Sequence, residues 1–302
     1  MYKVLWFDDE HKTLEEIEEE FSDNGIQLFG VSNAKDGLSS LRERRMDFDA
    51  ILLDGMFFND SDQSGDPNES AFGKVVMELG SLNTKGIIIP WFILSGQKNF
   101  VKERSPMIEM LREQAYADGK VFDKLEDKVE LCNAIKKAAD KQPLTKARHN
   151  NPELMGIFEL GYLSDDVEGN VMDLLIKPLP RSSTELKEIL TNIRSIQESC
   201  LLKLESIRVL DASLRTFKEK MEHLSGNSSY QSSWKPISNV YQIKEIRNLH
   251  EWIYHTCGTY IHYLKDQHYS GYMISNYAVE SLRTGLLEIL MWFKKTYEEN
   301  LD

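Results

Sequence analysis

The sequence predicts an α/β domain with a doubly wound, five-stranded parallel sheet, followed by an all-α helical bundle domain. Five short apolar runs recur along the first 141 residues, and amphipathic stretches of helical length separate them. Strands that alternate with helices in this way form parallel sheets covered by helices on both faces. After about residue 142 this alternation stops and helical spacing of apolar residues takes over, which predicts the bundle.

The five apolar runs define the expected strands of the sheet. The first, third and fourth are almost continuously apolar, as strands buried on both faces are. Pro90 lies inside the fourth run and is expected near its first residues or at a bulge, because proline cannot donate a ladder hydrogen bond. The runs cover residues 2–7, 26–31, 49–53, 87–94 and 120–123, and the expected helices cover about 12–24, 33–45, 70–80, 100–116 and 126–141.

A polar segment that contains two prolines, 142–152, is expected to link a first domain at 1–141 to a second at 153–302. Within the second domain, the Gly- and Ser-rich segment 226–233 is expected to be a loop that divides the helices into two groups. The expected helices cover about 153–161, 167–178, 184–222, 237–266 and 274–299.

The composition is that of a globular protein and excludes several classes of function. The chain has 302 residues, enough for two domains, and a formal net charge of −13, which argues against general affinity for nucleic acid or anionic membranes. No apolar stretch approaches the roughly 20 residues that span a bilayer. The first residues lack a signal-peptide pattern, and the three cysteines lie far apart. We therefore expect a cytoplasmic protein without membrane insertion.

Acidic and polar side chains stand where the expected strands end. Asp8 and Asp9 follow the first strand, and Asp54 follows the third. Because the carboxyl ends of parallel strands meet at one edge of a sheet, these carboxylates are expected to gather and to need a hard cation such as Mg²⁺. Ser95 ends the fourth run and Lys124 follows the fifth, adding a hydroxyl and an ammonium. Such a set suits the holding of a phosphoryl group during in-line transfer.

Residues 1–141 resemble a response-regulator receiver domain, a flavodoxin-like fold of two-component systems. The matching motifs are VLWFDDE with its acidic pair, AILLDG with its phosphoacceptor, FILSG with its hydroxyl and VFDK with its lysine. The resemblance implies that Asp54 accepts a phosphoryl group from a sensor histidine kinase or a phosphotransfer protein. No dedicated enzymatic activity is expected beyond the receiver's own phosphorylation and dephosphorylation.

The same resemblance implies a role for each remaining site residue. Asp9, Asp54 and the backbone carbonyl of Met56 would bind Mg²⁺ directly. Asp8 would bind it through water. Ser95 and Lys124 would contact the phosphate oxygens in the phosphorylated state.

Three features depart from the receiver pattern. The family has a proline in a cis bond after the lysine, where this chain has Leu125; a non-proline cis bond costs about 2.5–4 kcal/mol, so a trans bond and an altered loop are expected. Val121 stands at the position of the family's switch aromatic, and Phe122 follows it. The acidic segment 59–69 lengthens the chain between the third and fourth runs. It is expected to be a solvated loop, with a lid that alters metal affinity or kinase choice as the alternative.

For the second domain we expect signalling through a protein partner or through self-association, for instance as a homodimer. Residues 143–302 hold 18 basic and 21 acidic residues, for a net charge of −3, and show no basic helix-turn-helix. A weaker resemblance to HEPN-type helical domains is carried by NIRSIQE at 192–198, IRNLH at 246–250 and GTYIH at 258–262. These domains include ribonucleases that use an Arg and a His with four to six residues between them. This chain departs from that spacing, because two residues separate Arg247 from His250 and seven separate Arg247 from His255. A phosphorylation-gated ribonuclease is the first alternative, and a DNA-binding regulator with an atypical helical module is the second.

Overall fold

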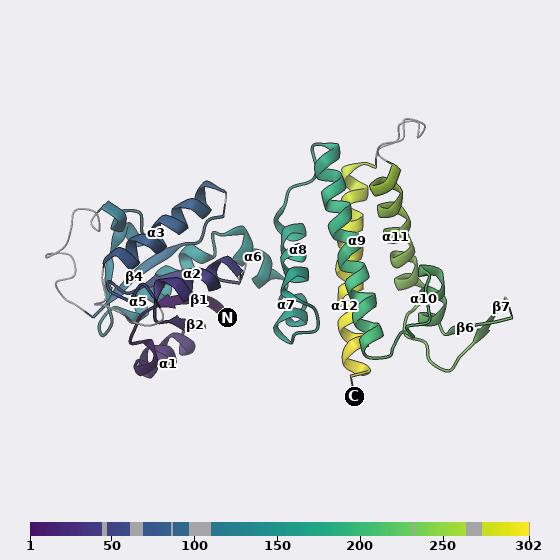
Figure 1. The fold of residues 1–302 in the computed structure, drawn as a ribbon, viewed down its shortest axis with the longest axis horizontal. Helices are drawn as coiled ribbons and strands as arrows, with labels where there is room; N and C mark the ends of the chain where they lie inside the picture. The colour runs from purple at the N-terminus through teal and green to yellow at the C-terminus, as the bar shows by residue number, and fades with distance from the viewer. Residues whose placement is uncertain are drawn as a thin grey trace. The chain divides into compact units, whose positions relative to one another are not determined.

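The computed structural model describes residues 1–43, 47–60, 69–85, 87–96, 110–231, 233–263 and 274–301. The chain forms two compact units, Met1–Lys146 and Ala147–Asp302 (Figure 1). Among the described residues, none of the helices combines the length and the apolar character that a bilayer crossing requires.

The first unit contains the predicted five-stranded parallel sheet. Its strands are β1 (Tyr2–Phe7), β2 (Ile26–Val31), β3 (Ala50–Leu53), β4 (Trp91–Ser95) and β5 (Val121–Asp123). Their order is β2-β1-β3-β4-β5, and every neighbouring pair is parallel. The order reverses between β1 and β3, and in sheets of this kind ligands bind beside the carboxyl ends of the strands at such a point.

Alternate residues of the strands build two cores, one on each face of the sheet. On one face, Leu5 and Phe7 of β1 pack with α2 (Ala34–Glu43) and α3 (Glu69–Thr84). On the other, Val4 and Trp6 pack with α1 (Glu15–Asp23) and α5 (Lys128–Ala139). Pro90 stands just before β4, and its carbonyl oxygen accepts a hydrogen bond from the Ile51 N–H at 2.9 Å. The proline therefore removes no donor from the strand.

The segment expected to be a linker, 142–152, is largely helical. Helix α6 spans Pro143–Asn150, and Pro152 begins α7 (Pro152–Glu159). Thr145 is buried, and its hydroxyl donates to Asp49 Oδ1 at 2.7 Å, which holds the start of α6 to the first unit. Pro143 and Pro152 both begin helices, where the missing N–H of proline costs nothing because the first N–H groups of a helix have no partner within it. The prediction that these prolines mark a non-helical linker is therefore wrong.

The second unit is rich in helices, as predicted. Helices α9, α11 and α12 pack against one another through buried side chains that include Ile193, Ile253 and Phe293, and α8 packs against α9. The helices that follow α7 are α8 (Asp165–Ile176), α9 (Ser183–Ser206), α10 (Phe217–Leu224), α11 (Lys244–Tyr263) and α12 (Asn276–Glu299).

The expectation that this half is entirely α-helical is wrong at one place. Strands β6 (Asn227–Tyr230) and β7 (Ser233–Pro236) form an antiparallel hairpin across the segment that was expected to be a loop. The hairpin strands are short and polar, so they lack the alternation of apolar residues that marks a half-buried strand.

The single helix expected over 184–222 is two helices. Helix α9 ends at Ser206, Arg208 adopts a left-handed backbone conformation with φ 63°, and α10 begins after Thr216. Thr216 and Glu219 form a reciprocal capping box, in which each side chain accepts from the other's backbone N–H. This motif is readable in the sequence as T-x-x-E and would have located the second helix start.

Candidate functional site

Three carboxylates meet at the carboxyl edge of the sheet, at the point where the strand order reverses. Side-chain oxygens of Asp8, Asp9 and Asp54 all lie within 4.8 Å of one another. The backbone places them: the Asp8 N–H donates to the Val31 carbonyl at 3.0 Å, and the Asp54 N–H donates to the Phe7 carbonyl at 2.8 Å. The parallel ladders thus continue one residue past β1 and β3 and deliver both aspartates to the same point.

Lys124 forms ion pairs with two of these carboxylates. Its Nζ lies 2.6 Å from Asp8 Oδ2 and 3.2 Å from Asp54 Oδ2. All three side chains are shielded from solvent, with exposed fractions of 11% for Lys124, 0% for Asp8 and 14% for Asp54. Burial alone would lower the pKa of Lys124, but the charges of Asp54 and Asp8 outweigh it, and the net shift is upward. Lys124 is therefore a cation at neutral pH.

Asp54 carries an electrostatic penalty in this setting. Burial is the main cause that raises its pKa from the ordinary 3.8 to about 6; the charge of Asp8 adds to it, whereas Lys124 and the Gly55 N–H oppose it. That N–H donates to Asp54 Oδ1 at 2.6 Å. Burial and the charge of Asp8 also raise the pKa of Asp9. One ammonium thus faces three carboxylates, and these oxygens fit a divalent cation such as Mg²⁺.

The remaining predicted site residues lie at the same edge or next to it. Ser95 ends β4 with 3% of its surface exposed, and it pairs in register with Asp123, the residue before Lys124. A Cβ added at Gly96 would lie 3.6 Å from Cδ of Lys124, so the lysine stem runs beside the Ser95–Gly96 segment. Met56 is half-buried, two residues after Asp54 on the chain that leaves this edge.

The loop after Lys124 is organised without a cis peptide bond. No peptide bond among the described residues is cis, so the bond between Lys124 and Leu125 is trans. The N–H groups of Leu125 and Glu126 donate to Asp123 Oδ1 at 2.8 Å and 3.2 Å. A proline at 125 would have no N–H to donate, so the turn that Asp123 closes depends on the N–H of Leu125. Sequence reasoning missed this role of Asp123.

Phe122 and Val121 pack on opposite faces of the sheet, so Phe122 does not stand where the resemblance leads one to expect an aromatic residue. Phe122 is 1% exposed and packs against Phe92, with ring centroids 6.5 Å apart, in the core beneath α1 and α5. Val121 packs on the opposite face of the sheet, toward the core shared with α2 and α3. Adjacent residues of a strand point to opposite faces of the sheet. An aromatic ring at position 122 therefore cannot reach the face of position 121 by changing its rotamer.

Two sequence expectations lie largely outside the described residues. Most of the acidic segment 59–69 and most of the helix expected over 100–116 fall there.

The residues behind the HEPN resemblance do not form an accessible Arg–His pair at the shorter spacing. His250 is fully buried, its Nδ1 lies 3.1 Å from Gln197 Nε2, and burial lowers its pKa to about 3. The guanidinium of Arg247 is held by Glu222 at 2.7 Å and by Glu251 at 2.9 Å. His255 is exposed on α11. A buried neutral imidazole cannot reach a nucleic acid.

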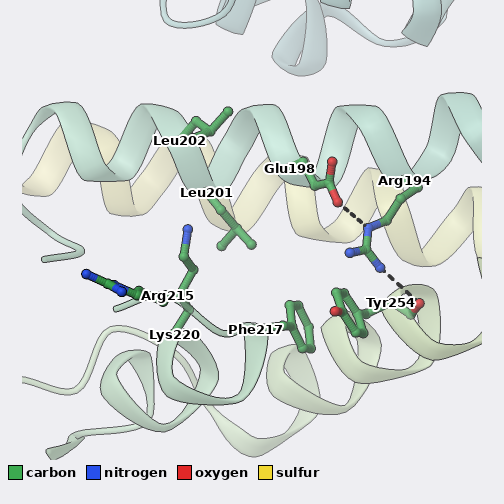
Figure 2. Close-up of a pocket in the computed structure, with 8 residues that line it drawn as sticks. All are labelled: Arg194, Glu198, Leu201, Leu202, Arg215, Phe217, Lys220 and Tyr254. Carbon is green, nitrogen blue, oxygen red and sulfur yellow. Dashed lines mark hydrogen bonds and ion pairs between the residues drawn. The ribbon is translucent and has the colours of Figure 1, made fainter. Parts of the chain in front are cut away.

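The second unit also has a pocket of about 250 Å³ between α9, α10 and α11 (Figure 2). The Arg194 guanidinium lies 3.6 Å from the centre of the Tyr254 ring, and Phe217 stacks on Tyr254 with ring centroids 3.8 Å apart. Arg194 pairs with Glu198 at 2.6 Å, and Lys220 pairs with Glu205. Arg194 and Lys220 already have carboxylate partners, so this stack explains how the three helices pack and assigns no ligand. The pocket is lined by Arg194, Glu198, Leu201, Leu202, Arg215, Phe217, Lys220 and Tyr254.

Comparisons with known proteins find similarity to solved structures. No protein-family model and no curated protein matches the chain. Solved structures similar to it include a response regulator receiver domain protein from Clostridium thermocellum, at 18% identity over 47% of this chain and 96% of that chain, with a TM-score of 0.35. The receiver domain of Francisella response regulator 1452 is 23% identical over 47% of this chain and 98% of that chain, with a TM-score of 0.33. Both of these solved structures are response regulator receiver domains, and the similarity covers about half of this chain.

Proposed function

We propose that the protein is a two-component response regulator in which Asp54 accepts a phosphoryl group, with Mg²⁺ held by Asp9, Asp54 and the Met56 carbonyl, and by Asp8 through water. One observation carries the proposal: Asp54 lies in one carboxylate group with Asp8 and Asp9 and also forms an ion pair with Lys124. An aspartate buried for a structural reason needs only one cationic or hydrogen-bonding partner. Here three carboxylates are gathered around one ammonium, so negative charge is concentrated at the site.

In this proposal a carboxylate oxygen of Asp54 attacks the phosphorus of a phosphohistidine on the partner kinase or phosphotransfer protein. The new bond joins that oxygen to phosphorus, the phosphorus–nitrogen bond breaks, and the imidazole leaves and takes a proton from solvent. Mg²⁺ supplies positive charge to the phosphoryl oxygens when it is bound. With a pKa of about 6, Asp54 is ionised and nucleophilic at neutral pH.

Lys124 and Ser95 complete the site on the side of β4 and β5. Once Asp54 is phosphorylated, its carboxylate charge moves onto the phosphoryl oxygens, and Lys124 exchanges one ion pair for another. Ser95 supplies a hydroxyl donor at the end of β4. Because both residues follow or end strands at the sheet edge, their movement acts on the segments that leave β4 and β5.

The second unit is proposed to signal through a protein partner or through self-association. Its sequence is net acidic, which disfavours nucleic acid as the partner.

Mg²⁺ is expected to raise the melting temperature of the wild-type protein, because a ligand that binds only the folded state stabilises it by mass action. The gain is about 2.7 kcal/mol at one hundred times the dissociation constant. Asp9→Asn should lose most of this shift, whereas Asp23→Asn, a change at an exposed aspartate at the end of α1, should keep it. Differential scanning fluorimetry with and without MgCl₂ measures the shift. An equal shift in Asp9→Asn and wild type contradicts the proposed ligand set.

Phosphorylation is expected to reach the second unit through the ends of β4 and β5. Hydrogen exchange with and without beryllofluoride, a phosphate mimic, should show altered protection within 95–141 and in part of 150–302. A bias of about 1.4 kcal/mol, a tenfold change in a two-state ratio, is sufficient. Val121 in place of an aromatic residue predicts a switch that differs from that of the family. Changes confined to 56–70 would instead identify the acidic segment as the effector.

A further inference from the structure

His11 follows the acidic pair closely and is buried, with 8% of its surface exposed. It begins the single-turn 3-10 helix η1 (His11–Thr13). Its Nδ1 lies 2.8 Å from the backbone carbonyl oxygen of Asp8. A carbonyl oxygen only accepts hydrogen bonds, so Nδ1 carries the hydrogen. The backbone N–H of His11 donates to the same oxygen at 3.3 Å, so one residue holds this carbonyl with two donors.

The carbonyl that His11 holds belongs to the peptide bond between Asp8 and Asp9. Because a peptide unit is planar, fixing its oxygen restricts the directions in which the chain leaves on both sides. On one side, the Asp8 carboxylate lies 2.6 Å from Lys124 Nζ. On the other, Asp9 contributes to the carboxylate group around Asp54. His11 can therefore act on two site carboxylates without touching either.

The sheet beneath the imidazole leaves space for it. A Cβ added at Gly30 in β2 would lie only 2.2 Å from Cδ2 of His11, so any larger residue would displace the ring. Gly30 pairs in register with Trp6 of β1, and the Trp6 ring meets the imidazole edge-on at 6.2 Å between centroids. The Asp8 carbonyl, the Trp6 ring and the space over Gly30 thus combine to orient the imidazole.

We propose that His11 is a positioning residue, which orients Asp8 and Asp9 for Mg²⁺ binding and phosphoryl transfer through its hydrogen bond to the Asp8 carbonyl. The inference rests on the proposed function. Partners that orient metal ligands from outside the coordination sphere typically change metal affinity by about 10–100-fold.

The test measures the dissociation constant for MgCl₂ by calorimetric titration of the full chain, together with the rate of phosphorylation at saturating MgCl₂. His11→Ala is expected to weaken Mg²⁺ binding about tenfold. His11→Asn should retain most of the affinity, because its Nδ2 occupies the place of Nδ1, whereas His11→Gln carries its amide one bond further and should resemble His11→Ala. The control is Thr13→Ala, which removes a hydrogen bond to the Glu10 carbonyl within the same turn and should leave Mg²⁺ affinity unchanged.

A second substitution, at Gly30 in the sheet, tests the position of the same imidazole ring. Gly30→Ala should weaken Mg²⁺ binding by displacing the imidazole, and it should add nothing in the His11→Ala background, since the two changes act through one contact. Melting in EDTA separates these effects from loss of the fold. Unchanged Mg²⁺ affinity in His11→Ala, or equal losses in His11→Asn and His11→Ala, overturns the inference while the proposed function stands. A wild-type chain that neither binds Mg²⁺ nor accepts phosphate overturns the proposed function itself.

Discussion

Asp54→Asn is expected to abolish phosphorylation of the protein by a small phosphodonor such as phosphoramidate in the presence of Mg²⁺. The wild type should gain one phosphoryl group per chain, and the variant none. The asparagine side chain has nearly the same shape but no carboxylate to attack phosphorus. Among the described residues, Asp54 combines the end of a buried central strand, the carboxylate group with Asp8 and Asp9, and the ion pair with Lys124.

Intact-mass spectrometry of the freshly treated protein measures the stoichiometry. Asp23→Asn is the matched control, because Asp23 is an exposed aspartate at the end of α1 and should leave the mass gain unchanged. Loss of the phosphoryl group on treatment with hydroxylamine would identify an acyl phosphate. A phosphoryl group that persists in Asp54→Asn would show that another residue is the acceptor.

The same substitution is expected to stabilise the metal-free protein at pH 8. The pKa of Asp54 is about 6 in the folded protein and 3.8 in its ordinary setting, because burial disfavours the charged form. Between these two values the folded state binds more protons than the unfolded state, so stability falls as pH rises from about 4 through about 6 and the loss is complete at pH 8. A shift of about two units corresponds to at most about 3 kcal/mol. Asparagine carries no charge and avoids this penalty.

Urea denaturation in EDTA at pH 5 and pH 8 measures the effect. The unfolding transition of the first unit is identified as the one whose midpoint moves when MgCl₂ is added. At pH 8, Asp54→Asn should unfold at higher urea than wild type; the difference should shrink at pH 5, where Asp54 is mostly protonated, and also in MgCl₂. A variant that is less stable than wild type at pH 8 in EDTA would mean that the ion pair with Lys124 outweighs the burial penalty.

Much of the first unit follows from local properties of the sequence. A run such as 2–7 is apolar enough to be buried on both faces, and a polar residue that follows it must lie at the edge of the sheet. Asp8, Asp54 and Lys124 were therefore predictable as residues of one edge of the sheet, because parallel strands end on the same side; their contact follows from the strand order. The TFKE capping box at Thr216 was equally readable, and the missed helix start there was an error of interpretation.

Other features depend on which distant residues meet, and these only the tertiary structure decided. The raised pKa of Asp54 depends on its burial and on the charge of Asp8, and the opposing ion pair comes from Lys124, 70 residues away. The buried bond between Thr145 and Asp49 extends the first unit into the expected linker, and the space over Gly30 is filled by His11. Local periodicity records which side of an element is buried. It does not record the partner on that side, because the free energy of a buried charge or hydrogen bond depends on groups that the fold supplies from elsewhere in the chain.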